Sequence, residues 1–244
     1  MHRCLVKTEE LLADTCTLTR EAARHLQTVL RVRSGDPVVL FDGHGRTRAV
    51  TVSAVDRNGL VFTAAAPALE HPRPVCALTL FACVSKGAHM DWTVEKATEL
   101  GAAQIVPVLS ARTVSRPADA ARWRRIAEEA GRQCGTAWLP EITDPLTFDA
   151  ALARTAQTRP LFAAALTPEA RPLRDALAAF SVPPSSAGWF VGPEGDFTPA
   201  ELAMLTAAGA IAVSLGPRIL RAETACLYGL CALSCAWQGG ASVH

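Results

Sequence analysis

The chain has 244 residues, of which 50% are hydrophobic and 19% are charged, so it can bury one large core or two smaller ones, and intrinsic disorder is excluded. Its 24 basic and 23 acidic side chains nearly cancel, which excludes a strong net field, and any contact with a polyanion must come from local patches. The eight cysteines form no CxxC pair and the six histidines lack metal-ligand spacing, so we expect no metal site.

The first part of the chain has the short alternating pattern of β-hairpins. A helix is indicated over residues 21–32. Strand-like runs follow at 37–41, 47–55 and 60–64, separated by the turn sequences DGHG and DRNG. We therefore expect a small β-barrel or sandwich. The sequence EHPRP at 70–74 contains two prolines and predicts a linker, which gives one domain over residues 1–72 and a second over residues 73–244.

The second part alternates between strands and helices. The apolar run at 75–84 is typical of a strand that is buried on both faces of a parallel sheet. This alternation predicts an α/β domain with a parallel sheet and helices on both faces. Helices are expected at 91–100, 118–131 and 171–180, and further strands at 104–110, 160–165, 188–191 and 211–215.

The last predicted helix, from Ala225 to Trp237, is apolar on every side. It is too short to span a bilayer, so we expect a helix that is buried all round. Cys226, Cys231 and Cys235 lie in it. Together with the absence of a signal peptide at Met1, they favour reduced core cysteines and a cytoplasmic protein.

Two loops in the second part contain the residues most suited to bind a ligand. Gly192-Pro193-Glu194-Gly195 follows a short apolar strand, and Thr198 and Glu201 then have the spacing of a capping box. The glycines permit a close approach of the backbone to a ligand, in the crevice where open α/β sheets bind their ligands. Composition alone leaves a plain tight turn equally open.

The second loop has the same setting, because it joins a strand to a helix that is expected to begin near Glu223. It contains Gly216 and Pro217, with Arg218 and Arg221 at its sides. Arginines in such a loop can bind a phosphate or carboxylate, or can pair with Glu223. Neither loop matches the P-loop or GxGxxG pattern, which argues against ATP hydrolysis and dinucleotide chemistry.

Four blocks of the sequence resemble the RsmE family of 16S rRNA uridine-N3 methyltransferases. They are HLQTVLRVRSGDPVVLFDG (25–43), CVSKGAHMDWTVEKATELG (83–101), VGPEGDFTPAEL (191–202) and LGPRILRAETA (215–225). The resemblance implies an N-terminal PUA-like β-barrel that helps to bind RNA. It also implies a C-terminal SPOUT domain with a deep trefoil knot, S-adenosylmethionine bound by the knot loops, and a homodimer formed through the SPOUT domain.

The same resemblance implies a cofactor site in the two loops and the helix start that follows them. The backbone of these loops would recognise the adenine and the ribose. The expected cofactor-binding residues are Gly192, Pro193, Glu194, Gly195, Leu215, Gly216, Ile219, Leu220, Arg221, Thr224 and Ala225.

The chain departs from the family pattern at two places. Asp196 stands where the family has a second glycine after GPEG, a change that we expect to be tolerated because the turn is already made. In the segment AGRQCGTAW (130–138), Arg132 and Thr136 replace the usual acidic residue and arginine. This second departure removes the basis for assigning RNA contacts or catalysis to that segment.

Methylation of uracil N3 requires that this nitrogen lose its proton. If N3 titrates roughly two units above the working pH, the anion costs about 2.7 kcal/mol, which modest electrostatic help can supply. Arg221 is the candidate for stabilising charge on the uracil oxygens or for positioning a phosphate, and Glu223 is the candidate proton acceptor. Lys96 and Glu99 are weaker candidates, since their spacing favours a solvated ion pair.

Two clusters of basic residues are candidate contacts with the small-subunit RNA. Such clusters are also common on ordinary solvated faces. The first cluster is Arg20, Arg24, His25, Arg31 and Arg33, and the second is Arg112, Arg116, Arg122, Arg124 and Arg125. The expected RNA-binding residues are Arg20, Arg24, His25, Arg31, Arg33, Lys86, Arg112 and Arg116.

Two other functions stay open at this point. One is an RNA-binding ribosome-assembly factor that keeps the fold and has lost catalysis, against which the intact LGPRILRAETA block argues. The other is a SPOUT methyltransferase that acts on a different RNA nucleotide, which the altered segment 132–136 favours slightly.

Overall fold

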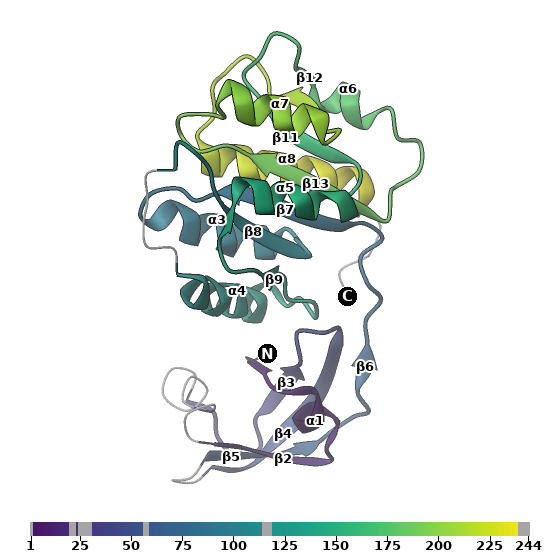
Figure 1. Cartoon of the computed structure of the whole chain (residues 1–244). Coiled ribbons are helices and arrows are strands. Elements are labelled where there is room, and N and C mark those ends of the chain that lie inside the picture. The colour runs from purple at the N-terminus through teal and green to yellow at the C-terminus, as the bar shows by residue number, and fades with distance from the viewer. Residues whose placement is uncertain (1, 20–22, 24–30, 56–58, 114–118, 239–244) are drawn as a thin grey trace. The chain divides into compact units, whose positions relative to one another are not determined.

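The computed structural model describes residues 2–19, 23, 31–55, 59–113 and 119–238 (Figure 1). The chain divides into two compact units. The first contains residues 1–73 together with 131–139, and the second contains residues 74–130 and 140–244. None of the described helices has the length and apolar character that a membrane crossing would require.

The first unit is built on one mixed sheet with the order β1-β3-β4-β5-β2. Strand β1 runs parallel to β3, and the other neighbours are antiparallel, so the predicted hairpins at 37–41, 47–55 and 60–64 are confirmed. The predicted helix at 21–32 lies almost wholly outside the described residues. The elements are β1 (His2–Leu5), α1 (Thr8–Leu12), β2 (Thr15–Thr19), β3 (Pro37–Phe41), β4 (Arg46–Val55), β5 (Gly59–Ala64) and β6 (Leu69–Glu70), which pairs with β4.

The strands of this unit bury one face each, as their alternating sequences predict. Val38 and Leu40 of β3 are buried, as are Leu60 and Phe62 of β5, and all four belong to the same apolar core. The turn after β3 is closed by Asp42. Its carboxylate accepts hydrogen bonds from the amides of residues 44 and 46, at 2.8 and 3.0 Å, and from a hydroxyl of α1 at 3.0 Å.

The segment 131–139 belongs to the first unit although it follows the strands by sixty residues. The amide of Gly45 donates to the carbonyl of Ala137 at 2.9 Å, and that of Leu139 donates to the carbonyl of Gly43 at 2.9 Å. Arg3 reaches the carbonyl of Thr136 at 2.9 Å. This grouping is not evident from the sequence, where the Pro-containing linker at 70–74 is the only boundary signal.

The second unit is built on one fully parallel sheet with the order β10-β8-β7-β13-β11-β14-β12, and β9 pairs with β8. The prediction of a parallel α/β sheet is therefore confirmed. The strands are β7 (Ala77–Cys83), β8 (Gln104–Leu109), β9 (Glu141–Ile142), β10 (Leu146–Thr147), β11 (Leu161–Ala164), β12 (Arg171–Pro172), β13 (Ser186–Val191) and β14 (Ile211–Ser214).

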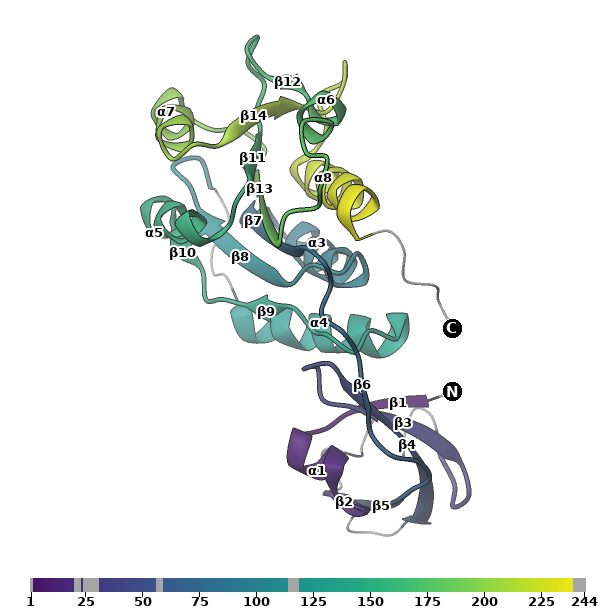
Figure 2. The ribbon, with the colours of Figure 1, turned by 90° about the vertical axis from the view of Figure 1, so that its right-hand side faces the viewer.

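Helices cover both faces of this sheet (Figure 2). Helices α5 and α7 pack on one face, with residues such as Phe81 of β7 beneath them, and α3, α4, α6 and α8 pack on the other, over Leu78 and Leu80. Helix α6 is shorter than the expected 171–180. The helices are α3 (Ala88–Glu99), α4 (Ala120–Cys134), α5 (Phe148–Arg154), α6 (Leu173–Leu177), α7 (Pro199–Ala207) and α8 (Ala222–Trp237), with a 3-10 turn, η2, at Thr155–Gln157.

Strand β14 is threaded through a connection that precedes it in the chain. The segment between β11 and β13 carries β12, which pairs with the outer edge of β14, and α6, which contacts both β14 and α8. Strand β14 therefore lies inside the loop that this segment forms, between β11 and β12. This threading agrees with the trefoil knot that the resemblance implies.

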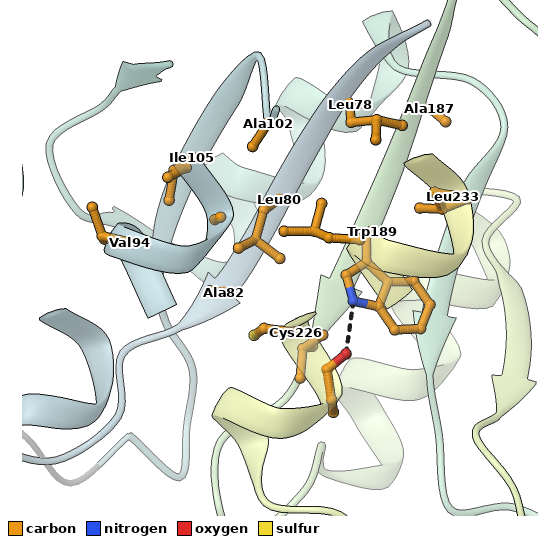
Figure 3. Packing of buried hydrophobic residues seen from close by; sticks show 14 of the residues in the cluster. Leu78, Leu80, Ala82, Val94, Ala102, Ile105, Ala187, Trp189, Cys226 and Leu233 are labelled. Atoms are coloured by element: carbon orange, nitrogen blue, oxygen red, sulfur yellow. Dashed lines mark hydrogen bonds between the residues drawn. The ribbon is translucent and has the colours of Figure 1, made fainter. Parts of the chain in front are cut away.

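Helix α8 is anchored to the sheet by a buried tryptophan (Figure 3). Nε1 of Trp189 donates to the carbonyl of Ala225 at 3.2 Å, and the indole lies directly against Gly229, where a Cβ would overlap the ring. The first turn of α8 is thus fixed against β13.

The expectation that α8 is buried all round is wrong for the single chain. Tyr228 is 49% exposed, and Cys231 and Cys235 are also exposed, so a stripe with helical spacing faces outward. The expectation of core cysteines holds for Cys4, Cys16, Cys76, Cys83 and Cys226 but not for Cys134, Cys231 and Cys235. Burial raises the pKa of Cys83 to about 12, which makes this thiol a poor nucleophile.

Candidate functional site

A cavity of about 280 Å³ opens at the carboxyl ends of β11, β13 and β14. Parallel strands that end side by side leave such a crevice, and their following loops supply its walls. The lining consists of residues 164–166, 191–194, 196, 213–216, 218–222 and 225.

The first wall is the loop that follows β13. The amide of Asp196 donates to the carbonyl of Pro193 at 2.9 Å, which closes a tight turn. Asp196 has a positive φ of 58° and accepts a hydrogen bond from the amide of Phe197 at 2.8 Å. A Cβ at Gly192 would lie 3.3 Å from the backbone nitrogen of Phe197, so the turn leaves little room for a side chain there.

The segment after β8 holds this loop in place. Nη1 of Arg112 donates to the carbonyl of Gly195 at 2.6 Å. Glu201 completes the predicted capping box with Thr198, and its other oxygen accepts a hydrogen bond from the amide of Ala111 at 2.9 Å. The carboxylate of Glu201 is buried, so it ties the start of α7 to the neighbouring loop.

The second wall is the loop between β14 and α8. Gly216 has a positive φ of 112°, and Arg221 is the N-cap residue of α8. The amides and carbonyls from Gly216 to Leu220 form no hydrogen bonds with any residue that the structure describes. They are therefore available to a ligand. The loop also carries Ile219, whose side chain is 80% exposed.

Charged groups of both signs line the cavity. Glu194 and Asp196 come from the first wall, and Arg218 and Arg221 come from the second. Apolar side chains such as Leu215 and Leu220 lie between them. The cavity can thus accept a ligand that has an apolar part and carries both a positive and a negative charge.

Most of the expected cofactor residues line this cavity. Gly195 and Thr224 do not, since Gly195 contacts Arg112 and Thr224 lies on the exposed side of α8. Residues 164–166, which follow β11, also line the cavity and were not predicted to do so. The sequence does indicate their position, because the predicted strand at 160–165 ends at the same edge of the sheet. The lining residues that match the expectation are Gly192, Pro193, Glu194, Leu215, Gly216, Ile219, Leu220, Arg221 and Ala225.

The two candidate catalytic residues have different surroundings. Arg221 is exposed and lines the cavity. Glu223 is outside the lining, and its carboxylate lies 3.1 Å from Nδ1 of His89. Lys96 pairs with Glu95 and Glu99 at 2.8 Å each, which raises the pKa of Lys96, so the ion pair that the sequence favoured is present.

The candidate RNA-binding residues are only partly described. Arg31 and Arg33 lie in the first unit, where Arg33 donates its amide to Asp36 at 2.7 Å. Lys86 is exposed, and its amide donates to Glu194 at 3.3 Å. The side chain of Arg112 donates a hydrogen bond to the loop after β13, at the carbonyl of Gly195. Outside the described residues lie Arg20, Arg24, His25 and Arg116.

Two family models match the chain. A model described as an RNA methyltransferase domain matches residues 71–234, and one described as an RNA methyltransferase PUA domain matches residues 18–64. A relative from Synechocystis sp., ribosomal RNA small subunit methyltransferase E, is 34% identical over 92% of this chain and 74% of its own length. The chain belongs to this methyltransferase E family.

Two further members of this family match the chain over most of their own length. The methyltransferase E of Bacillus subtilis is 30% identical over 91% of this chain and 90% of its own. A crystal structure of the Neisseria gonorrhoeae enzyme, bound to S-adenosyl methionine, has 29% identity and a TM-score of 0.86, and covers 97% of this chain and 98% of that one. The expected SPOUT domain with an N-terminal PUA-like barrel is therefore confirmed.

The segment that departs from the family pattern has a structural role in this chain. The hydroxyl of Thr136 accepts a hydrogen bond from the amide of Trp138 at 3.1 Å and donates to its carbonyl at 3.0 Å. The Trp138 ring packs over Gly45 and under the guanidinium of Arg73, 4.5 Å from the ring centre. Thr136 thus stabilises a turn inside the first unit.

Proposed function

We propose that this chain transfers a methyl group from S-adenosylmethionine to N3 of a uridine in 16S rRNA of the small ribosomal subunit, and that it works in the cytoplasm. The observation that carries the proposal is the cavity between the two loops, in a chain of the methyltransferase E family. The two loops are the blocks whose resemblance to the family is most specific.

The cavity fits S-adenosylmethionine in shape and charge. The unpaired backbone groups from Gly216 to Leu220 suit the edge of an adenine, and Leu215 and Leu220 suit its faces. Glu194 and Asp196 would attract the cationic groups, and Arg218 would attract the carboxylate. The bound cofactor supplies a methyl group on a positively charged sulfur, which makes this carbon reactive toward a nitrogen nucleophile.

Arg221 has the position to support the methylation of uracil. It lies at the exposed rim of the cavity, and its planar guanidinium carries a positive charge. Its guanidinium would stabilise negative charge on the uracil oxygens or hold the target phosphate, while the loops orient the two reactants.

Replacement of Arg221 by Ala tests this role. We expect turnover to fall by about 10²-fold, because one preorganised donor is lost from the site. Cofactor affinity, measured by isothermal titration calorimetry, should change much less. Arg154→Ala, on the exposed surface of α5, is the matched control. Unchanged turnover in R221A would remove Arg221 from the chemistry.

The first domain, residues 1–72, would bind the RNA together with basic residues of the second. The candidates are the eight basic residues expected from the sequence. Lys86 lies next to the cavity wall, because its amide donates to Glu194, whereas the guanidinium of Arg112 already donates to the carbonyl of Gly195. Phosphate contacts release counterions, so RNA affinity should fall steeply with salt. Affinity that is independent of ionic strength would count against both clusters.

The enzyme would act as a homodimer formed through α8. Trp92 of α3 and Tyr228 of α8 are both exposed, on two helices that contact each other, and Ile219 is exposed close to the start of α8. A second copy that packs against α8 would lie next to the cavity, since the lining extends to Ala225 of the same helix.

Mass spectrometry tests which nucleotide is methylated, and titration calorimetry tests whether the chain binds S-adenosylmethionine. Mass spectrometry of 16S rRNA from a strain that lacks the gene should show one uridine without its N3 methyl group. Loss of a methyl group from another nucleotide would identify a different target. A chain that binds no S-adenosylmethionine in titration calorimetry would instead be a catalytically silent RNA-binding factor.

A further inference from the structure

A histidine–carboxylate contact joins the first turn of α3 to the first turn of α8. Nδ1 of His89 lies 3.1 Å from Oε1 of Glu223; the Glu223 side chain is 10% exposed and that of His89 is 48% exposed. The other ring nitrogen, Nε2, has no hydrogen-bond partner among the residues that the structure describes. The pair therefore has one buried end and one end that is open to a ligand.

Neither member of the pair lines the cavity, but each is attached to a segment that does. Glu223 follows Arg221 and Ala222, which line the cavity, and precedes Ala225, which lines it as well. On the other side, the loop that leads to His89 is attached to the first wall, because the amide of Lys86 donates to Glu194 at 3.3 Å. Both ends of the pair are thus held by segments that form the cavity.

Few other groups next to the cavity can accept a proton near neutral pH. Arginine and lysine side chains there stay protonated, and carboxylates are weak bases. A neutral imidazole is a stronger base than a carboxylate, and His89 is the only histidine among the described residues of the second unit. A carboxylate that accepts Nδ1–H fixes the tautomer in which Nε2 is the base.

We infer that His89 is the base that removes the N3 proton of the target uracil, and that Glu223 is the residue that positions it. This inference rests on the proposed function. Nε2 takes the N3 proton as the N3 electron pair forms the new bond to the methyl carbon, and the pair of the broken carbon–sulfur bond stays on sulfur. The product is an imidazolium whose Nδ1–H faces the Glu223 carboxylate.

The charges around His89 support this assignment. Helix α8 presents Glu223 and no other carboxylate or cationic side chain. The preceding loop presents Lys86. Along α3, Asp91 is paired with Arg122 of α4, and Glu95 is paired with Lys96. The first wall presents Glu194. Glu223 is therefore the carboxylate in direct contact with the ring.

His89→Asn distinguishes a role of His89 as a base from a role in which it only holds α3 and α8 together. The Asn amide can still donate to Glu223, but nothing replaces Nε2. We expect kcat at pH 7 to fall by about 10²- to 10³-fold, within the range of general base catalysis, with cofactor affinity within about twofold of the wild type. The deficit should shrink as the pH rises, because the uracil then loses its proton to water without help. Arg154→Ala, on the exposed surface of α5, is again the control.

Glu223→Gln tests the positioning role. The Gln amide removes the negative charge that faces the ring and no longer selects the tautomer with Nδ1–H, so kcat should fall, by less than in H89N, while KM for the RNA and cofactor affinity stay within about twofold of the wild type. Glu223→Asp should recover part of the lost kcat.

Three results would overturn the inference. They are a wild-type rate and pH profile in H89N, a deficit that is constant with pH, or an unchanged kcat in E223Q. A wild-type chain that binds no cofactor or methylates no uridine would instead refute the proposed function. Calorimetry and the assay of the wild-type chain detect that outcome independently of the H89N and E223Q variants.

Discussion

Among single residues, Asp196 combines an unusual backbone with a place in the cavity wall. Its φ of 58° is in the left-handed region, which Asp tolerates better than most residues because its side chain bonds locally, here to the amide of Phe197. The family's glycine at this position is the residue for which that conformation has no cost. The chain therefore tolerates mild backbone strain at Asp196, which places a carboxylate in the wall of the cavity.

Asp196→Gly should separate these two effects. We expect the free energy of unfolding to change by less than about 1 kcal/mol, because relief of strain offsets the greater freedom of Gly in the unfolded chain. Cofactor affinity should fall, since the cavity loses a negative charge. Asp196→Asn removes the charge but keeps a side chain that tolerates this conformation. Calorimetry on both variants measures affinity, and equal affinity in all three proteins would exclude an electrostatic role.

Asp42 predicts how acid affects the first unit. Burial alone would raise the pKa of Asp42, but hydrogen bonds from the amides of His44 and Arg46 and from the Thr8 hydroxyl outweigh it, so this pKa lies below its ordinary value. The carboxylate therefore stabilises the fold above the ordinary aspartate pKa, near 4, and this contribution disappears as the pH falls through the lowered value.

Asp42→Asn should lose this stabilisation at neutral pH, by about 1.5–3 kcal/mol for hydrogen bonds to a charged group. The difference from the wild type should narrow as the pH falls below about 4 and should disappear below the lowered pKa of Asp42, where both side chains are neutral. Urea unfolding that is followed by tryptophan fluorescence at several pH values measures this. A difference that does not depend on pH would show that the charge has no part in it. Asp144→Asn, at an exposed carboxylate, is the control.

Among the elements, α8 depends on one close contact with the sheet. A Cβ at Gly229 would overlap the buried ring of Trp189, which also donates a hydrogen bond to Ala225. Gly229→Ala would favour an isolated helix by about 1 kcal/mol. In this fold we expect a net loss of about 1–3 kcal/mol, because the core must shift to accept the methyl group.

Thermal unfolding of G229A measures this loss. The control is Cys231→Ala, which changes an exposed position on the same helix and should have little effect. A G229A protein that is more stable than the wild type would mean that Trp189 moves away freely. The same variant should weaken cofactor binding, since the start of α8 contributes to the cavity.

The sequence predicted the long elements well and the short ones poorly. Apolar runs and the capping box of Thr198 and Glu201 located the strands and helices of both loops. Helix α5 was missed because it has only seven residues, with two buried, and the two-residue strands β9, β10 and β12 carry no periodic signal. Their formation depends on the neighbouring strands, not on local sequence.

The candidate site was predictable where it lies within contiguous motifs. The loops after β13 and β14 supply most of the lining, and both were located from the sequence. The loop after β11 and the contact between His89 and Glu223 join segments far apart in the chain, so no local pattern indicates them. The outward stripe of α8 was also hidden, because an apolar helix has the same sequence whether its own core or a partner covers it.

At the scale of the whole molecule, the exposed stripe of α8 predicts the state of assembly. Tyr228→Arg should convert the proposed dimer to a monomer, because a buried charge at the centre of an interface lacks a partner. Light scattering coupled to gel filtration measures the mass. Val182→Arg, at an exposed apolar residue outside this helix, is the control. A wild-type protein that is monomeric at micromolar concentration would refute the dimer.

The grouping of residues 131–139 with the first unit has a consequence for how the protein can be divided. Cutting the chain after Arg73 would deprive this segment of Arg3, Gly43 and Gly45, its partners in hydrogen bonding and packing. A single recombination event at the linker therefore could not transfer the complete barrel unit from one enzyme to another. We therefore expect residues 1–73 and 131–139 to evolve together, so that a substitution in the barrel is compensated by a substitution in the segment 131–139.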